Sequence, residues 1–241
     1  MFKVDRFLIC YLSYCVLQSS ASDVDVSFIK PCKADDNACM TSSLQAAIPY
    51  FAAGIPKLNL KTVDPLYIDT INSDSSNLKL TFKNIKVMDI SKAKVTIFER
   101  DAVKQTLKFS LETPVSLNGL YELNGKILIL NAFGIGEFET HTNKLLINYD
   151  MKYEIIDKDG NKYLKITTVN YTYDIVEKLH IKLHNLFGGD KTLAEPVNNL
   201  LNKNWKDVVV EFGPIINKII HEYVNFIKKI FLVVPRNKFE I

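Results

Sequence analysis

Two histidines, His180 and His184, have a spacing that could belong to a metal site. Imidazole nitrogen is a common metal ligand, but a complete site needs further ligands that converge on the same point. On a β-strand both histidines share the face of Lys182 and oppose Ile181 and Leu183, because successive side chains point to opposite faces. We therefore expect solvent-exposed histidines and predict no metal site.

The segment 157–160, Asp-Lys-Asp-Gly, resembles the start of a calcium-binding loop. Such a loop needs Gly at its sixth position and Glu at its twelfth, where this chain has Lys162 and Thr168. A turn between two antiparallel strands explains the segment better.

General catalytic motifs are missing from the sequence. It has no Gly-x-Ser-x-Gly elbow, no His-Glu-x-x-His zinc motif and no Walker phosphate loop. We therefore predict a protein that is not an enzyme and that uses no cofactor.

The N-terminus has the pattern of a secretory signal peptide. Lys3 and Arg6 precede the apolar run 7–17, and the small residues 19–21 follow it as a cleavage site. We expect residues 1–21 to be a signal peptide and residues 22–241 to form one domain, since no Pro/Gly/Ser-rich linker divides them. The mature protein should be secreted and extracellular.

Cys32 and Cys39 are the cysteines that remain after removal of the signal peptide. In an oxidising compartment, two cysteines this close should form a disulfide. Two thiolates alone do not make a zinc site, and no histidine is close to them in sequence.

The charge of the chain is close to neutral, +3 before and +2 after loss of residues 1–21. No dense basic block is present, so we predict neither nucleic-acid binding nor a polybasic membrane patch. No other apolar run reaches the roughly 20 residues of a membrane span, so we expect no stable membrane insertion.

A period of two dominates residues 58–186 and predicts antiparallel strands. The clearest run alternates from Leu145 to Ile155, and shorter runs are 78–82, 107–111, 169–175 and 179–183. We expect turns at Asn118-Gly119, at Asn124-Gly125 and at 157–161. Asn170 begins the sequon Asn170-Tyr171-Thr172 and opposes apolar neighbours, so it should be an exposed glycosylation site.

Helical patterns stand at both ends of the strand region. Residues 39–53 predict a short helix that stops at Gly54, with Pro49 as a kink. From Leu193 to Leu232, steps of three and four predict one long helix, bent at Gly213-Pro214.

These elements predict an α+β fold in which a strongly curved antiparallel sheet wraps the long C-terminal helix. The two apolar surfaces could enclose an elongated hydrophobic tunnel or pack into a solid core, and periodicity alone does not separate the two. The candidate ligand contacts are large apolar and aromatic residues of the sheet and the helix: Tyr121, Leu128, Leu130, Phe133, Phe138, Tyr149 and Tyr153, and Trp205, Phe212, Ile216, Ile219, Tyr223 and Ile227.

An ordered set of motifs resembles the takeout and juvenile-hormone-binding protein family of insects, over roughly residues 32–235. The set comprises Cys32 and Cys39, Gly54-Ile55-Pro56, Asp64-Pro65-Leu66, residues 119–128, Gly134-Ile135-Gly136, residues 186–191, Asn198 and residues 201–205. A mature chain with two cysteines looks closer to the takeout branch, since moth haemolymph carriers look to have a second disulfide. Gly188, Ala194 and Asn131-Ala132 depart from residues common in the family.

The resemblance implies a helix wrapped by a curved sheet, with a hydrophobic tunnel for terpenoid or fatty-acyl lipids. The predicted function is a secreted carrier of a small hydrophobic ligand, in a fluid such as insect haemolymph. The alternative is an interaction protein that presents lipid to a receptor or a membrane surface. The sequence identifies no receptor.

Overall fold

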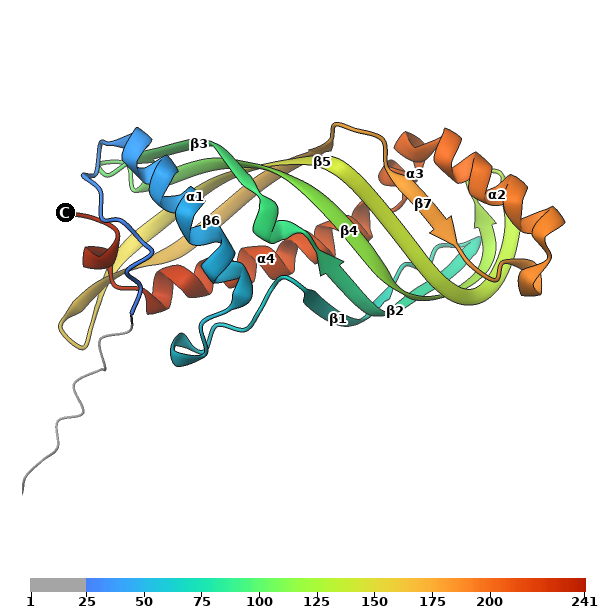
Figure 1. The fold of residues 1–241 in the computed structure, drawn as a ribbon, viewed down its shortest axis with the longest axis horizontal. Helices are drawn as coiled ribbons and strands as arrows, with labels where there is room; N and C mark the ends of the chain where they lie inside the picture. The colour runs from blue at the N-terminus through green and yellow to red at the C-terminus, as the bar shows by residue number, and fades with distance from the viewer. Residues whose placement is uncertain (1–24) are drawn as a thin grey trace, which may run out of the picture.

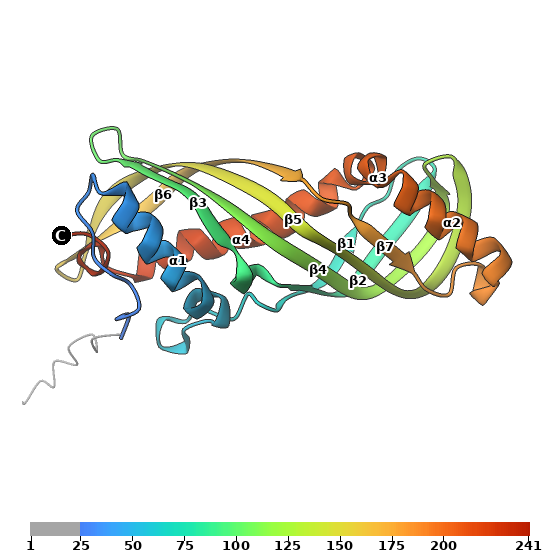
Figure 2. The same cartoon turned by 45° about the horizontal axis from the view of Figure 1, so that its top comes forward.

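The computed structural model describes residues 25–241, so the predicted signal peptide lies outside the described part. The molecule is elongated (Figure 1). Strands β4 and β5 run along most of its long axis, with α1 and the C-terminus near one end and α2 near the other (Figure 2). We call these the α1 end and the α2 end.

One antiparallel sheet of seven strands forms the body of the fold, with the path β1-β2-β4-β5-β6, β3 beside β4, and β7 beside β5. The strands are β1 (Leu66–Asn72), β2 (Leu78–Met88), β3 (Lys94–Asp101), β4 (Thr106–Ile127), β5 (Leu130–Lys158), β6 (Asn161–Ile175) and β7 (His180–Leu183).

The two longest strands change neighbours along their length. The first half of β4 pairs with β3 and its second half with β2, while β5 pairs first with β7 and then with β6. The β4–β5 ladder shifts register between Thr113 and Val115, next to Pro114. A proline within a sheet is tolerated at such a bulge, and bulges bend strands and increase their twist. These irregularities allow the sheet to curl along α4, which confirms the predicted fold class.

Two of the predicted turns are wrong. Asn118-Gly119 and Asn124-Gly125 both lie inside β4. A Cβ at Gly125 would lie 2.2 Å from the carbonyl oxygen of Asn77, so this glycine allows a close approach of chains rather than a turn. The turn at Asp159-Gly160 between β5 and β6 is confirmed, with both residues at positive φ.

The C-terminal helical region is divided into α2 (Lys191–Lys203), α3 (Trp205–Glu211) and α4 (Gly213–Val233). The predicted helical segment is therefore present, with single-residue breaks at Asn204 and Phe212 that divide it into three helices. The second break, at Phe212, falls next to the expected bend, where Pro214 occupies the first turn of α4 and lacks a backbone donor. Short 3-10 helices are η1 (Pro56–Leu58), η2 (Ile90–Lys92), η3 (Phe187–Gly189) and η4 (Arg236–Lys238).

Asparagines on α2 bind the backbone of β7 along its free edge. Asn198 accepts from the N–H of Leu183 at 2.8 Å and donates to its carbonyl at 3.0 Å. One turn later, Asn202 does the same with Ile181, at 3.0 and 2.6 Å. Four helical residues rise about 6 Å and two strand residues about 6.6 Å, so the two repeats match. The helix thereby covers an edge that would otherwise be open to other strands.

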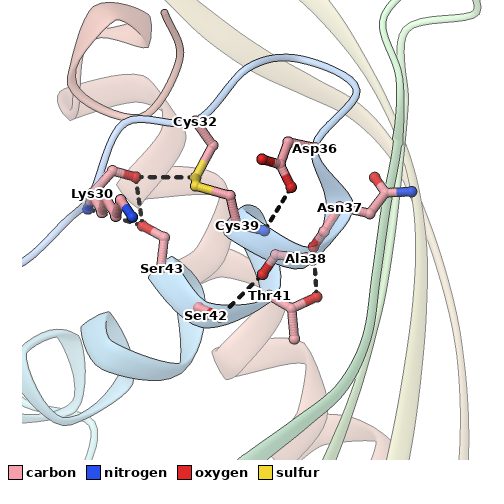
Figure 3. Close-up of a disulfide and its surroundings, with 9 residues drawn as sticks. All are labelled: Lys30, Cys32, Asp36, Asn37, Ala38, Cys39, Thr41, Ser42 and Ser43. Carbon is pink, nitrogen blue, oxygen red and sulfur yellow. Dashed lines mark hydrogen bonds between the residues drawn. A yellow bond between two sulfur atoms is a disulfide. The ribbon is translucent and has the colours of Figure 1, made fainter.

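The α1 end is fixed by a disulfide. The structure has the predicted Cys32–Cys39 bond, at the start of α1 (Asn37–Ala53) (Figure 3). Asp36 caps this helix by accepting from the N–H of Cys39 at 2.9 Å. The C-terminal tail lies alongside: Cys32 donates to the carbonyl of Phe239 and accepts from the N–H of Ile241, both at 3.0 Å.

Candidate functional site

An apolar cavity of about 350 Å³ lies between the inner face of the sheet, α1 and α4. Its lining extends from Met40 and Phe239 at the α1 end to Leu201 and Val208 of α2 and α3. The volume is in the range of small-molecule sites, roughly 300–1,000 Å³. The cavity therefore follows the long axis of the molecule.

The helical side of the cavity agrees with the sequence prediction. Phe212, at the break before α4, and Ile216, Ile219, Tyr223 and Ile227 on α4 all line it. Their spacing of three and four residues places them on one face of the helix. From the sheet, the predicted Phe138 and Tyr149 line the cavity as well.

The other candidates lie outside this lining. Tyr121 is completely buried and donates its hydroxyl to the carbonyl of His184 at 2.6 Å. Burial raises the pKa of this phenol to about 12. Leu128 and Leu130 flank the β4–β5 turn, and Trp205 begins α3.

Phe133 lies on the outer face of the sheet and is 56% exposed, so its expected inward position is wrong. On this part of β5 the inner positions are Gly134 and Gly136. A Cβ on either would meet the chain at residues 184–186. A Cβ on Gly134 would lie 3.0 Å from Leu186 Cα, and a Cβ on Gly136 would lie 2.2 Å from His184 O. The alternation therefore places small residues inside and large ones outside.

Two tyrosines bring polar groups to the cavity wall. Tyr223 donates to the carbonyl of Val63 at 3.2 Å. Tyr149 packs against Phe109, and its hydroxyl has no hydrogen-bond partner within residues 25–241. Burial raises the pKa of both phenols, so both stay protonated near neutral pH and can donate.

Several lining residues were not among the sequence candidates. α1 contributes Met40, Leu44 and Phe51, and β3 and β4 contribute Phe98 and Phe109. Phe109 belongs to the alternating run 107–111, so its inward position could have been predicted from the sequence. The α1 residues carry no equivalent signal, because nothing in that segment indicates which element it will face.

Arg100, on β3, also lines the cavity, although its side chain is only 2% exposed. It forms an ion pair with Glu240 and donates from Nε to the hydroxyl of Tyr153 at 3.1 Å. Tyr153, a predicted ligand contact, is thus placed beside the cavity rather than in its lining. An arginine on a strand usually projects into solvent, so the burial of this one could not be predicted from the sequence.

A serine, a histidine and a carboxylate meet outside the cavity. The Ser116 hydroxyl donates to Asp89 at 2.6 Å and lies 2.9 Å from Nδ1 of His141. In a catalytic triad the histidine accepts the serine proton and the carboxylate binds the other ring nitrogen. Here the serine proton goes to the carboxylate, and the other nitrogen lies beside Asn143 at 2.8 Å. The arrangement is not that of a triad.

The surface candidates lie as expected where the structure describes them. His180 is exposed, and His184 is partly exposed beside Glu139 at 3.2 Å. Within residues 25–241, no three His, Cys, Asp or Glu side chains gather in a way that could hold a metal. Asn170 is exposed on β6, so its sequon is accessible, and its glycosylation stays a prediction.

A match to a protein-family model shows which proteins this chain is related to. The model of the haemolymph juvenile hormone binding protein family matches residues 10–239. The chain belongs to this family. Its fold is one that binds hydrophobic ligands, in agreement with the apolar cavity.

Individual relatives agree with this assignment. The crystal structure of Takeout 1 from Epiphyas postvittana superposes with a TM-score of 0.83 at 29% identity, covering 88% of this chain and 99% of that one. The circadian clock-controlled protein daywake of Drosophila yakuba is 26% identical over 223 residues, 86% of this chain and 84% of the relative. The juvenile hormone-binding protein of Manduca sexta is 25% identical over 95 residues, 38% of this chain and 41% of the relative. None of the helices in the described part of this family member is long and apolar enough to cross a membrane.

Proposed function

We propose that this protein is a secreted carrier that holds one long apolar molecule in its internal cavity. The observation that carries the proposal is the cavity itself, a space of about 350 Å³ with an almost entirely apolar lining. A packed core would have filled this space, because protein interiors leave few voids larger than a water molecule. A ligand of elongated shape, such as a terpenoid or a fatty-acyl chain, fits a lining that extends from α1 to α3.

The expected affinity follows from the buried area. Burial of a few hundred Å² of apolar ligand contributes several kcal/mol at about 25 cal/mol per Å². Immobilisation of the ligand offsets part of this, which leaves affinity on the order of micromolar or tighter. We expect the lining residues of α4, together with Phe138 and Tyr149, to contact the ligand. The free hydroxyl of Tyr149 can donate to an ester, epoxide or carbonyl oxygen along the chain.

Secretion is supported by the signal-like N-terminal sequence and by the disulfide, which persists in oxidising compartments. The decisive experiment has two parts. Native mass spectrometry of protein purified from its own fluid should show a bound mass that organic extraction removes. The delipidated protein should then bind a fluorescent fatty-acyl or terpenoid probe. If no probe from either class binds, the carrier function is refuted.

Presentation of lipid to a receptor is a second candidate, favoured by one observation. Leu120, Phe133 and Ile135 are 42%, 56% and 66% exposed on the outer face of β4 and β5. Grouped exposed apolar side chains mark many interaction sites. Replacement of Phe133 and Ile135 by Ser should leave probe binding unchanged, while uptake of the loaded protein by cells of the source tissue should fall only if this candidate is correct.

A further inference from the structure

A group of charged side chains lies at the α1 end of the cavity, where Arg100 belongs to the lining. Arg100 of β3 and Arg236 of η4 both pair with Glu240 of the C-terminal tail. Arg236 binds both carboxylate oxygens, with Nε 2.7 Å from Oε2. The guanidinium of Arg100 also lies 5.5 Å from the ring centroid of Tyr153. We call Arg100, Arg236, Glu240 and Tyr153 the Arg100 cluster.

The cluster has unused hydrogen-bond donors. Nη2 of Arg100 is buried and has no partner among the described residues. The Tyr153 hydroxyl accepts from Arg100, and within residues 25–241 its own proton has no acceptor. A buried donor left without a partner keeps its full desolvation penalty, which is larger when the donor is charged. Such a group calls for a missing acceptor.

The charge of the cluster indicates what kind of acceptor is missing. Two guanidinium groups face one carboxylate, so these side chains carry one excess positive charge; the Arg100 and Glu240 side chains are 2% and 10% exposed, and that of Arg236 is 27% exposed. A neutral carbonyl would satisfy Nη2 but would leave the charge in place. A second carboxylate would accept from Nη2 and would also neutralise the excess charge. Guanidinium groups bind carboxylates in short, charge-assisted hydrogen bonds.

We infer that Arg100 binds the carboxylate of a long-chain acid whose apolar chain lies in the cavity. The inference rests on the proposed carrier function and adds to it the ligand class and its orientation. The head group lies at the α1 end, beside the disulfide and the tail. The chain extends along α4 toward α3.

The first test compares an acid with its neutral ester. Palmitic acid and methyl palmitate are titrated into delipidated protein in competition with a fluorescent probe. The acid should bind about tenfold more tightly, which corresponds to one charge-assisted hydrogen bond. Equal affinities would overturn the inference but leave the carrier function standing. If neither compound binds and no other probe does, the proposed function fails as well.

The variant Arg100→Met tests the residue itself. It leaves Arg236 paired with both oxygens of Glu240, so it strands no buried carboxylate. The ratio of the two affinities should fall to about one. Lys104→Met is the matched control, since it removes one positive charge from the exposed turn after the same strand. It should keep the wild-type ratio, and an acid preference that survives in Arg100→Met would overturn the inference.

Orientation can be tested in the wild-type protein even if Arg100→Met does not fold. Trp205 is the only tryptophan of the sequence, and it begins α3, far from the α1 end (Figure 1). Stearic acid with a nitroxide near its methyl end should quench Trp205 more strongly than stearic acid with a nitroxide near its carboxylate. The reverse order would place the head group at the α2 end and refute the inference.

Discussion

At the α2 end, the inner face of β5 carries Gly134 and Gly136, whereas at the α1 end the facing strands carry Phe98, Phe109 and Tyr149. Glycines allow the chain at residues 184–186 to lie directly on the sheet and leave no space between the layers. Large side chains hold α1 and α4 further away, and they enclose a cavity where their tips do not meet. The same curved sheet thus packs tightly where β5 carries glycines and borders an apolar cavity where its side chains are large.

Polar groups differ between the ends in the same way. Under α2, the side-chain amides of Asn198 and Asn202 each bind both backbone groups of one residue on β7. In the Arg100 cluster, a buried donor remains without a partner. Complete pairing stabilises a fold, whereas an unpaired buried donor leaves a hydrogen bond still to be made.

The largest loss of stability is expected at the α2 end, from Asn198→Ala. The change leaves the buried N–H and C=O of Leu183 without partners, which should lower the free energy of unfolding by about 2–4 kcal/mol. Urea denaturation measures the loss. Asn199→Ala is the matched control, because Asn199 is exposed on the same helix. Similar losses in both variants would mean that the amide pairing with β7 contributes little.

A slightly smaller loss is expected at the α1 end when Cys32 and Cys39 are both replaced by Ser. Removal of this short cross-link should cost about 2–3 kcal/mol through the entropy of the unfolded chain. In reductant, the denaturation midpoint of the wild type should fall to that of the variant. The midpoint of the variant should be the same with and without reductant. A midpoint that is equal in all four samples would contradict the prediction.

The cavity should tolerate added volume that the rest of the core does not. Ile216→Trp fills space beside Phe212, so we expect a loss of less than about 1 kcal/mol and a weakening of probe binding by about tenfold or more. Ile166 of β6 is buried outside the cavity lining, and Ile166→Trp should cost about 1–3 kcal/mol through overpacking, with unchanged affinity in the folded fraction. Thermal melts and titrations of both variants measure the two effects. If Ile216→Trp destabilises as much as its control and probe affinity is unchanged, Ile216 is ordinary core.

The smallest effect is expected at Asn170, which belongs to the polar network of neither end. Protein from a eukaryotic secretory host should lose mass on treatment with a glycan-releasing amidase, and Asn170→Gln should abolish this loss. Because Asn170 is exposed, the variant should change the free energy of unfolding by no more than about 0.5 kcal/mol. Untreated wild-type protein with the mass of the bare chain would refute the modification.

Period-two and helical patterns were sufficient to predict the sheet, the apolar face of α4 and the fold class. They failed where close packing decides the residue type. Gly119 and Gly125 looked like turn residues, but they sit within β4 where neighbouring chains come close. Phe133 looked like core because its side chain is large and apolar. Hydrophobicity indicates the inner face only where that face has room for a side chain, and here it has none. Arg100 was unpredictable, since its burial depends on Glu240, 140 residues later in the chain.

The backbone hydrogen bonds of Cys32 with Phe239 and Ile241 join two segments that are far apart in the sequence. Contacts of such large sequence separation form only after the chain between them has folded back on itself. The α1 end of the cavity is therefore expected to close late in folding, after the strands of the sheet have paired.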